Sequence, residues 1–143
     1  MNLVSKNNII RGSYGALWVN ENLLAEVKSF EAKVTLNYEE VSIAQELGTH
    51  NRYMGFNGEG TMVLHKVDSF LAGLLVDGIK SGEMPDIKMV GKLEDPTALG
   101  AERVELIEVT FDELTLLKFE NKTILEQEAP FKFADFNTID LIQ

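Results

Sequence analysis

An alternation of apolar and polar residues runs through the first half of the chain and predicts β-strands. From Ser29 to Tyr38 every even position is apolar and every odd position is polar, which is the period of a strand with one buried face. Before it, ALWVNENLLAEV reads as two short strands around a turn at residues 20–22, because asparagine tolerates the backbone conformations of tight turns. Further on, EGTMVLHKV shows less contrast between its faces, which indicates a strand covered on both sides.

One segment, DSFLAGLLVDGIKSG, has the period of an amphipathic helix instead. The apolar residues that fall near one face of this helix are Phe70, Leu71, Leu74, Leu75 and Ile79. Asp68 or Ser69 can cap its first amides, and Gly82 followed by Pro85 ends it. The sequence therefore predicts a helix over about residues 68–81.

Beyond the helix the alternation returns and predicts further strands. DIKMVGKLE reads as one strand, and RVELIEVTFDELTLLKF reads as one long strand or two strands broken near Asp112. Between them DPTALGAE is expected to be a loop, and Asn121 with Lys122 makes the next turn. The last strand, TILEQEAPFKFADF, contains Pro130, which has no N–H and belongs at a sheet edge or a bulge.

Together these elements predict a mostly-β fold: a β-sandwich or barrel of six or more antiparallel strands with one flanking α-helix. With 143 residues, 45% of them apolar, the chain is long enough to bury a core of its own. No internal repeat, low-complexity tract or linker divides it, so we expect a single domain over residues 1–143.

The connection within LNYEEVSIAQELGTHNRYMGFNGEG, residues 36–60, is longer than a hairpin requires, since hairpin loops usually contain about two to five residues. We therefore expect a long inter-strand loop that protrudes at about residues 39–56. Val41, Ile43 and Leu47 make this segment too apolar for a flexible linker. Because a surface loop rarely exposes so much apolar area, residues 41–56 are expected to form an interface.

Residue types that could support catalysis are present but are not arranged for it. HKVDSF contains His65, Asp68 and Ser69, the types found in a hydrolase triad, but it has no nucleophile elbow and crosses a strand-to-helix junction. His50 has no second ligand at the spacing of a metal site. In GFNGEG the glycine intervals do not fit a phosphate loop, so the glycines are expected to allow a bend or a close backbone approach. The sequence predicts no enzyme activity, no catalytic residue, no cofactor and no metal.

The charge balance narrows the classes of partner. Thirteen Lys and Arg against 23 Asp and Glu give a formal net charge of −10, which disfavours a surface that holds nucleic acid or an anionic membrane. The absence of cysteine excludes disulfides and thiolate-bound zinc. The longest apolar run, from Phe70 to Val76, is too short to span a bilayer, and the start lacks a secretory signal. We expect a protein that is made in the cytoplasm and does not bind membranes.

The running sequence also resembles a known family. The chain is similar to tail tube proteins of contractile-tailed phages, in particular the PBSX-like prophage family, and of R-type, diffocin-like bacteriocins. The similar stretches are GSYGALWVNENLLAEVKSFEAKVTLNYEEVSIAQELGTHNRYMGFNGEGTMVLHKV, GEMPDIKMVGKLEDPTALGAERVELIEVTFDELTL and PFKFADFNTIDLI. They cover almost the whole chain.

This resemblance implies a structural protein that forms hexameric rings, which stack into the inner tube of a contractile phage tail or an R-type bacteriocin. It implies sheath, baseplate and tape-measure proteins as partners, DNA only as passing cargo, and assembly in the bacterial cytoplasm into a released particle. In the family the long loop reaches neighbouring subunits. The residues expected to make this inter-subunit contact are Glu39, Glu40, Val41, Ile43, Leu47, Tyr53, Met54 and Phe56.

Two other classes of protein stay open at this point. A small-ligand-binding β-barrel would need a roomy pocket with a few convergent polar groups, and a hydrolase would need a perturbed acid–base pair in a cleft. For a tube, the acidic balance predicts a pore wall with more acidic than basic side chains, since such a wall does not hold the phosphates of DNA. The sequence does not distinguish a phage tail from a headless bacteriocin.

Overall fold

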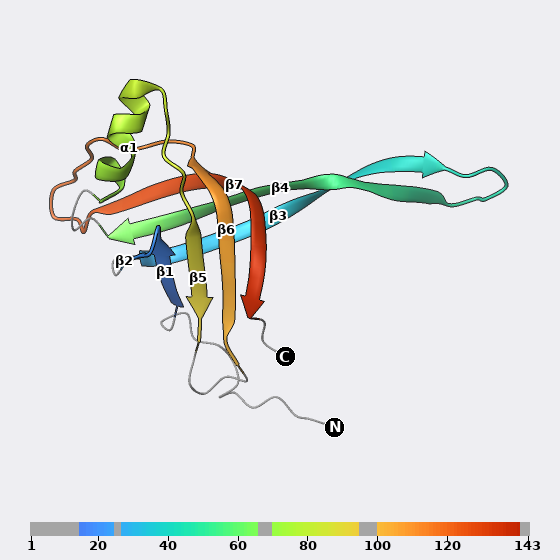
Figure 1. The fold of residues 1–143 in the computed structure, drawn as a ribbon, viewed down its shortest axis with the longest axis horizontal. Coiled ribbons are helices and arrows are strands. Elements are labelled where there is room, and N and C mark those ends of the chain that lie inside the picture. Colours follow the sequence, from blue (N-terminus) through green and yellow to red (C-terminus); the bar gives the residue numbers. More distant parts are fainter. Residues whose placement is uncertain (1–14, 25–26, 66–69, 95–99, 141–143) are drawn as a thin grey trace.

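The structure is a computed structural model and describes residues 15–24, 27–65, 70–94 and 100–140. Its elements in chain order are β1 (Gly15–Val19), β2 (Asn22–Leu24), β3 (Val27–Ser42), β4 (Thr49–His65), α1 (Phe70–Ser81), β5 (Met89–Leu93), β6 (Glu102–Phe111) and β7 (Glu126–Asp140) (Figure 1). The predicted mostly-β fold with one helix is confirmed. The proposed caps Asp68 and Ser69 lie outside the described residues.

The seven strands of the described residues form one antiparallel sheet in the order β2-β1-β5-β6-β7-β4-β3. The sheet does not close into a barrel, because β2 and β3 remain at its two ends. It turns at β7, which bends partway along its length (Figure 1). The stretch Glu126–Phe133 of β7 pairs with β4, and the stretch Phe131–Asp140 pairs with β6. A bent, partly wrapped sheet of this kind fits the predicted sandwich.

Strands that are distant in the sheet order face each other across the core. The ring of Phe30 in β3 stacks on Phe131 in β7, with ring centroids 5.8 Å apart. The same ring lies against Gly91 in β5, where an added Cβ would come within 3.3 Å of it. Because β6, β7 and β4 lie between β5 and β3 in the sheet, this contact shows that the sheet folds over to enclose its apolar face.

The core forms where the two parts of the sheet and α1 meet. Its most deeply buried side chains are Leu17, Val19, Met62, Leu75, Met89, Leu106, Val109 and Phe131. The helix contributes Leu71 and Leu75, whereas Ile79, expected on the same face, is exposed. Alternating apolar residues in the strands and an apolar helix stripe thus meet in one cluster, as their periods predict.

The turn between β1 and β2 is the one expected at residues 20–22. Asn20 and Glu21 have φ angles of 46° and 71°, the left-handed conformation that two-residue hairpins require. The Asn20 side chain accepts a hydrogen bond of 2.9 Å from the Lys88 backbone N–H, and the Asn20 N–H donates to the Lys88 carbonyl at 2.9 Å. Asn20 therefore also fixes the chain that enters β5.

The strand predicted through LTLLKF does not form. β6 ends at Phe111, and residues 113–120 contain no strand or helix. The Asp112 N–H donates to the Pro130 carbonyl at 2.9 Å, but Pro130 has no N–H to return the bond, so the β6–β7 ladder stops there. Without a pairing partner, the apolar pattern of residues 113–120 is not sufficient to make a strand.

Candidate assembly interface

The segment predicted as a loop is a two-stranded arm. We define the arm as residues 35–57, the part of the β3–β4 hairpin beyond Gly58, which is the last residue of β4 that pairs with β7. Nine residues of β4, Thr49 to Asn57, extend past the body, which corresponds to about 30 Å at roughly 3.3 Å per residue. Figure 1 shows the arm projecting along the longest axis of the molecule.

The arm protrudes as expected, but its backbone is paired. β3 continues to Ser42 and β4 begins at Thr49, so the irregular connection is limited to residues 43–48. In this connection Gln45 has a φ angle of 69°, and the Glu46 N–H donates to the Ile43 carbonyl at 3.2 Å. Side chains of His50 and Glu46 also contact each other. Cross-strand pairing therefore gives the arm a defined shape within a single copy.

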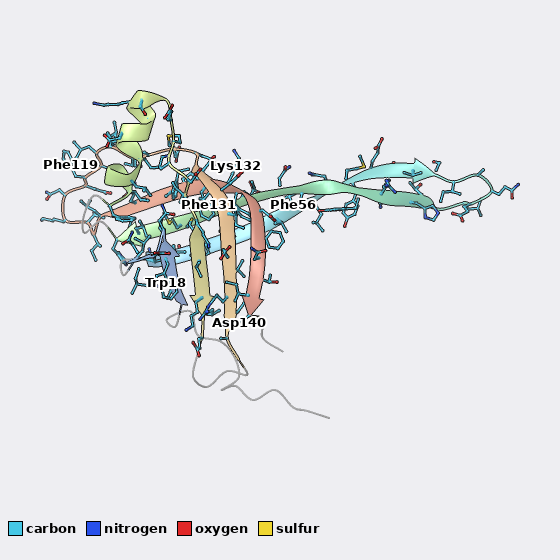
Figure 2. All side chains as sticks on the ribbon, in the orientation of Figure 1. Trp18, Phe56, Phe119, Phe131, Lys132 and Asp140 are labelled. Carbon is cyan, nitrogen blue, oxygen red and sulfur yellow. The ribbon has the colours of Figure 1, made fainter. Side chains whose placement is uncertain are left out.

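Aromatic rings fasten the base of the arm to the body. Phe56 packs edge-on against Phe136 of β7, with ring centroids 5.6 Å apart, and Phe136 in turn contacts Phe133 at 6.4 Å. Phe133 continues the row to Phe131 in the core, also at 6.4 Å (Figure 2). Phe56, expected at an inter-subunit contact, is thus half-buried within its own chain. The row joins the root of the arm to the core.

A β-bulge changes the register partway along the arm. Asn37 pairs with Gly55, but Tyr38 pairs with Tyr53, which leaves Met54 without an opposing residue. Gly55 has a φ angle of 134°, a backbone conformation that other residues rarely adopt. Beyond the bulge the rings of Tyr38 and Tyr53 meet edge-on with centroids 5.9 Å apart. The bulge therefore sets the direction of the outer part of the arm.

The other expected contact residues all lie on the arm and face solvent. Glu39, Glu40 and Val41 are on β3, Ile43 and Leu47 are in the connection at the tip, and Tyr53 and Met54 are on β4. Leu47 is fully exposed, and Ile43, Tyr53 and Met54 are about half exposed. The structure brings these residues together on one projecting element and leaves a large part of their apolar surface exposed.

A second exposed apolar surface was not expected from the sequence. We call residues 113–125, which connect β6 to β7, the apolar segment. Four of its side chains are 78–81% exposed: Leu116, Leu117, Phe119 and Ile124. In the sequence, LTLLKF reads as the continuation of a strand, and Asn121 with Lys122 reads as a turn. The feature that distinguishes an exposed irregular segment from a strand here is the end of the β6–β7 ladder at the proline in the facing strand.

Trp18 lies on the outer face of the sheet rather than in the core. It is partly buried beside a depression lined by Trp18, Lys88, Val90, Lys92, Arg103 and Ile139 among others. Three of the charged groups there are paired: Lys88 with Glu105 at 3.1 Å, Lys92 with Glu94 at 2.6 Å, and Arg103 with Asp140 at 4.0 Å. These pairs leave few polar groups available to orient a ligand, which weakens the case for a ligand-binding barrel.

Catalytic and metal-binding chemistry finds little support in the described parts of the chain. Residues 15–24, 27–65, 70–94 and 100–140 contain no group of three or more His, Cys, Asp or Glu placed to hold a metal ion. Lys92 lowers the pKa of Glu94 and Lys28 lowers the pKa of Glu126, each by a direct hydrogen bond, and both pairs are on the surface. No helix among the described residues is long and apolar enough to cross a membrane.

Comparisons with known proteins agree with this geometry. The family model described as "Phage tail tube protein" matches residues 2–140. The chain is 36% identical over 132 residues to the phage-like element PBSX protein XkdM of Bacillus subtilis (strain 168), covering 91% of this chain and 90% of that protein.

Solved structures share the fold at low sequence identity. A chain of the PVC sheath–tube complex, an extracellular contractile injection system in its extended state, matches with a TM-score of 0.75 at 10% identity, covering 93% of both chains. A chain of the anti-feeding prophage cap, the tube-terminating cap, matches with a TM-score of 0.76 at 8% identity, covering 96% of this chain and 95% of that one. The predicted resemblance is confirmed: the chain belongs to the phage tail tube protein family, and its role is that of a structural tube component.

Proposed function

We propose that this protein forms hexameric rings that stack into the inner tube of a contractile particle, with the arm as the connection between rings. The observation that carries the proposal is the arm itself. It extends about 30 Å from the body at roughly 3.3 Å per residue, and it leaves Leu47 fully exposed and Tyr53 and Met54 about half exposed.

The physical argument is that an isolated hairpin is a weak element. Two strands without a third are marginally stable in water, and exposed apolar patches on a soluble domain generally mark contact surfaces. Leu36, Tyr38 and Tyr53 lie on the same face of the hairpin as Phe30 and Met62, which the body covers. A neighbouring copy that covers this face would stabilise the hairpin and use the surface that the chain leaves open.

The open edges of the sheet are an argument for a closed ring of subunits. The outer edge of β3 has no partner strand in the described chain, and neither has the outer edge of β2 at the other end of the sheet. Exposed edges tend to pair with other chains, and a closed ring of identical subunits removes them. Six subunits per ring is the number implied by the family resemblance.

The same proposal implies partner proteins and a place of assembly. Sheath, baseplate and tape-measure proteins are the expected partners, and the expected setting is assembly in the bacterial cytoplasm into a released particle. With a formal charge of −10 per chain, the pore is expected to pass DNA without holding it. We further infer that the protein catalyses nothing, which is consistent with the exposed, ion-paired state of its shifted carboxylates.

Negative-stain electron microscopy of the purified protein at high concentration tests the proposal. Rings or tubes of uniform width are expected. The matched control replaces residues 37–55 by Asn-Gly, because Leu36 and Phe56 lie opposite each other and a two-residue turn can join them. This armless variant should keep a folded body and form no tubes. A wild-type chain that stays monomeric at every concentration, even with baseplate components added, would contradict the proposal.

A further inference from the structure

We propose that the apolar segment, residues 113–125, is the surface on which the arm of a neighbouring copy docks. The inference rests on the proposed self-assembly and adds the receiving half of the contact. Its first support is the exposure of Leu116, Leu117, Phe119 and Ile124, which is higher than that of most apolar side chains on the arm. Four such side chains in thirteen residues form a patch that a soluble domain rarely leaves uncovered.

The patch is held in place at both ends. Leu114 packs against the core, and Asp112 is fixed by its backbone bond to Pro130 and by an ion pair of 3.3 Å with Lys132. At the other end the chain enters β7 at Glu126, which pairs with Lys28 at 2.6 Å. The segment between these anchors therefore presents its apolar side chains from a defined place on the body.

The positions of the two surfaces match what a repeating assembly needs. Figure 1 shows the arm at one end of the longest axis and the chain between β6 and β7 at the other, beside the end where α1 lies. In Figure 2 Phe119 lies at the end opposite the arm, and Phe56 marks the root from which the arm extends away from Phe119. A contact between identical patches closes as a dimer, whereas continued stacking requires two different patches that meet head to tail. The arm and the apolar segment are such a pair.

The charges of the two surfaces are also compatible. Three Glu and one Arg give the arm a formal charge of −2, whereas two Glu and two Lys make the apolar segment neutral in a chain of −10. Lys118 precedes Phe119 and Lys122 follows it by three residues; neither forms an ion pair within 4.0 Å of a carboxylate that the structure describes, and Lys118 lies near enough to Glu126 to help lower the pKa of that carboxyl. Glu39 and Glu40 on the arm can pair with these lysines, while the apolar side chains cover one another.

The natural absence of cysteine allows a direct test by crosslinking. Leu47→Cys at the tip of the arm and Leu117→Cys in the apolar segment lie at opposite ends of one copy, so they cannot be joined within a chain. When the double variant has assembled, treatment with a short thiol crosslinker should give a ladder of covalent multimers. Each single variant alone should give none. A pair of Leu47→Cys with Leu23→Cys, an exposed position on β2, is the matched control.

A second variant separates this inference from the proposed function. Leu116→Ser, Leu117→Ser and Phe119→Ser together change only exposed side chains, so the body should keep its circular dichroism spectrum and melting temperature. The protein concentration at which tubes form should rise at least about tenfold, because each tenfold corresponds to a loss of roughly 1.4 kcal/mol of contact free energy. Rings that no longer stack support the inference.

The results that would overturn the docking assignment differ from those that would overturn the tube proposal. Tubes that form without a crosslinked ladder, or serine variants that polymerise as wild type does, would overturn the docking assignment while leaving the tube proposal intact. The same holds if the serine variant stacks normally but no longer binds sheath, since the segment would then face another partner. If the wild-type chain forms neither rings nor tubes, the proposed function itself fails.

Discussion

Gly58 of β4 lies directly against the ring of Phe133 in β7: a Cβ added at Gly58 would come within 2.4 Å of that ring. Two residues away, a Cβ at Gly60 would come within 2.3 Å of the Glu31 carbonyl and 2.5 Å of the Phe131 ring. Gly58 and Gly60 of GFNGEG therefore serve the close approach predicted for this stretch, since they allow the aromatic row to lie on the sheet at the root of the arm.

Replacing either glycine should destabilise the body. Gly58→Ala and Gly60→Ala force the rings or the backbone apart, and overpacking of this kind typically costs about 1–3 kcal/mol. Chemical denaturation of each variant measures the change in the free energy of unfolding. Gly48→Ala is the control, because nothing lies within 4 Å of its added Cβ, and it should stay within about 0.5 kcal/mol of wild type.

Replacing the apolar residues at the tip should separate folding from assembly. Ile43→Ser with Leu47→Ser changes two exposed side chains, so the unfolding free energy should shift by less than about 0.5 kcal/mol. The same variant should lose tubes in sedimentation and electron microscopy, because the contact made by the tip loses its apolar atoms. Normal polymerisation of this variant would show that the tip is not the connector.

The Lys28–Glu126 pair predicts a pH dependence of stability. Lys28 lowers the pKa of Glu126 below its ordinary value of 4.5 in the folded state, so the unfolded chain binds the proton more readily. The pair should therefore stabilise the fold fully above about pH 4.5 and lose its effect as the pH falls through the folded-state pKa. Carboxyl NMR titration of Glu126 measures this pKa directly. Lys28→Met should raise it, while Glu94, paired with Lys92, should titrate as before.

Ionic strength should favour assembly from low values upward. A ring of six copies, each with a formal charge of −10, carries −60, and this repulsion must be screened before apolar contacts can hold the subunits together. Light scattering against NaCl concentration should show the onset of assembly at lower protein concentration as salt is added. Tubes that dissolve in moderate salt would indicate a contact held mainly by exposed ion pairs instead.

Much of the body could be predicted because its strands have one buried face. The alternation in β7, where Ala129, Phe131 and Phe133 are buried, and the stripe around Leu71 and Leu75 in α1 show this. The alternation from Ser29 to Tyr38 also became a strand, β3, but its expected inner face is exposed beyond Phe30. The arm could not be predicted as strand throughout, because beyond the body both faces are exposed and no alternation is required. Its pairing depends on backbone bonds between β3 and β4, which leave little trace in residue type.

Contacts between distant parts of the chain account for the other differences. The bend in β7 places Phe136 beside Phe56, and only the folded sheet shows this contact, while a contact of Phe56 with another subunit stays a prediction. The end of β6 depends on Pro130, which is 18 residues beyond Asp112 in the chain. Local periodicity cannot report such pairings, so the sequence predicts a strand through LTLLKF that the structure does not contain.

The bulge at Met54 and Gly55 affects how straight a long tube can be. If each ring joins the next through this arm, any angular error in the arm is repeated at every ring and adds up along the tube. A single glycine with a φ angle of 134° would then influence whether many identical contacts produce a straight tube or a curved one.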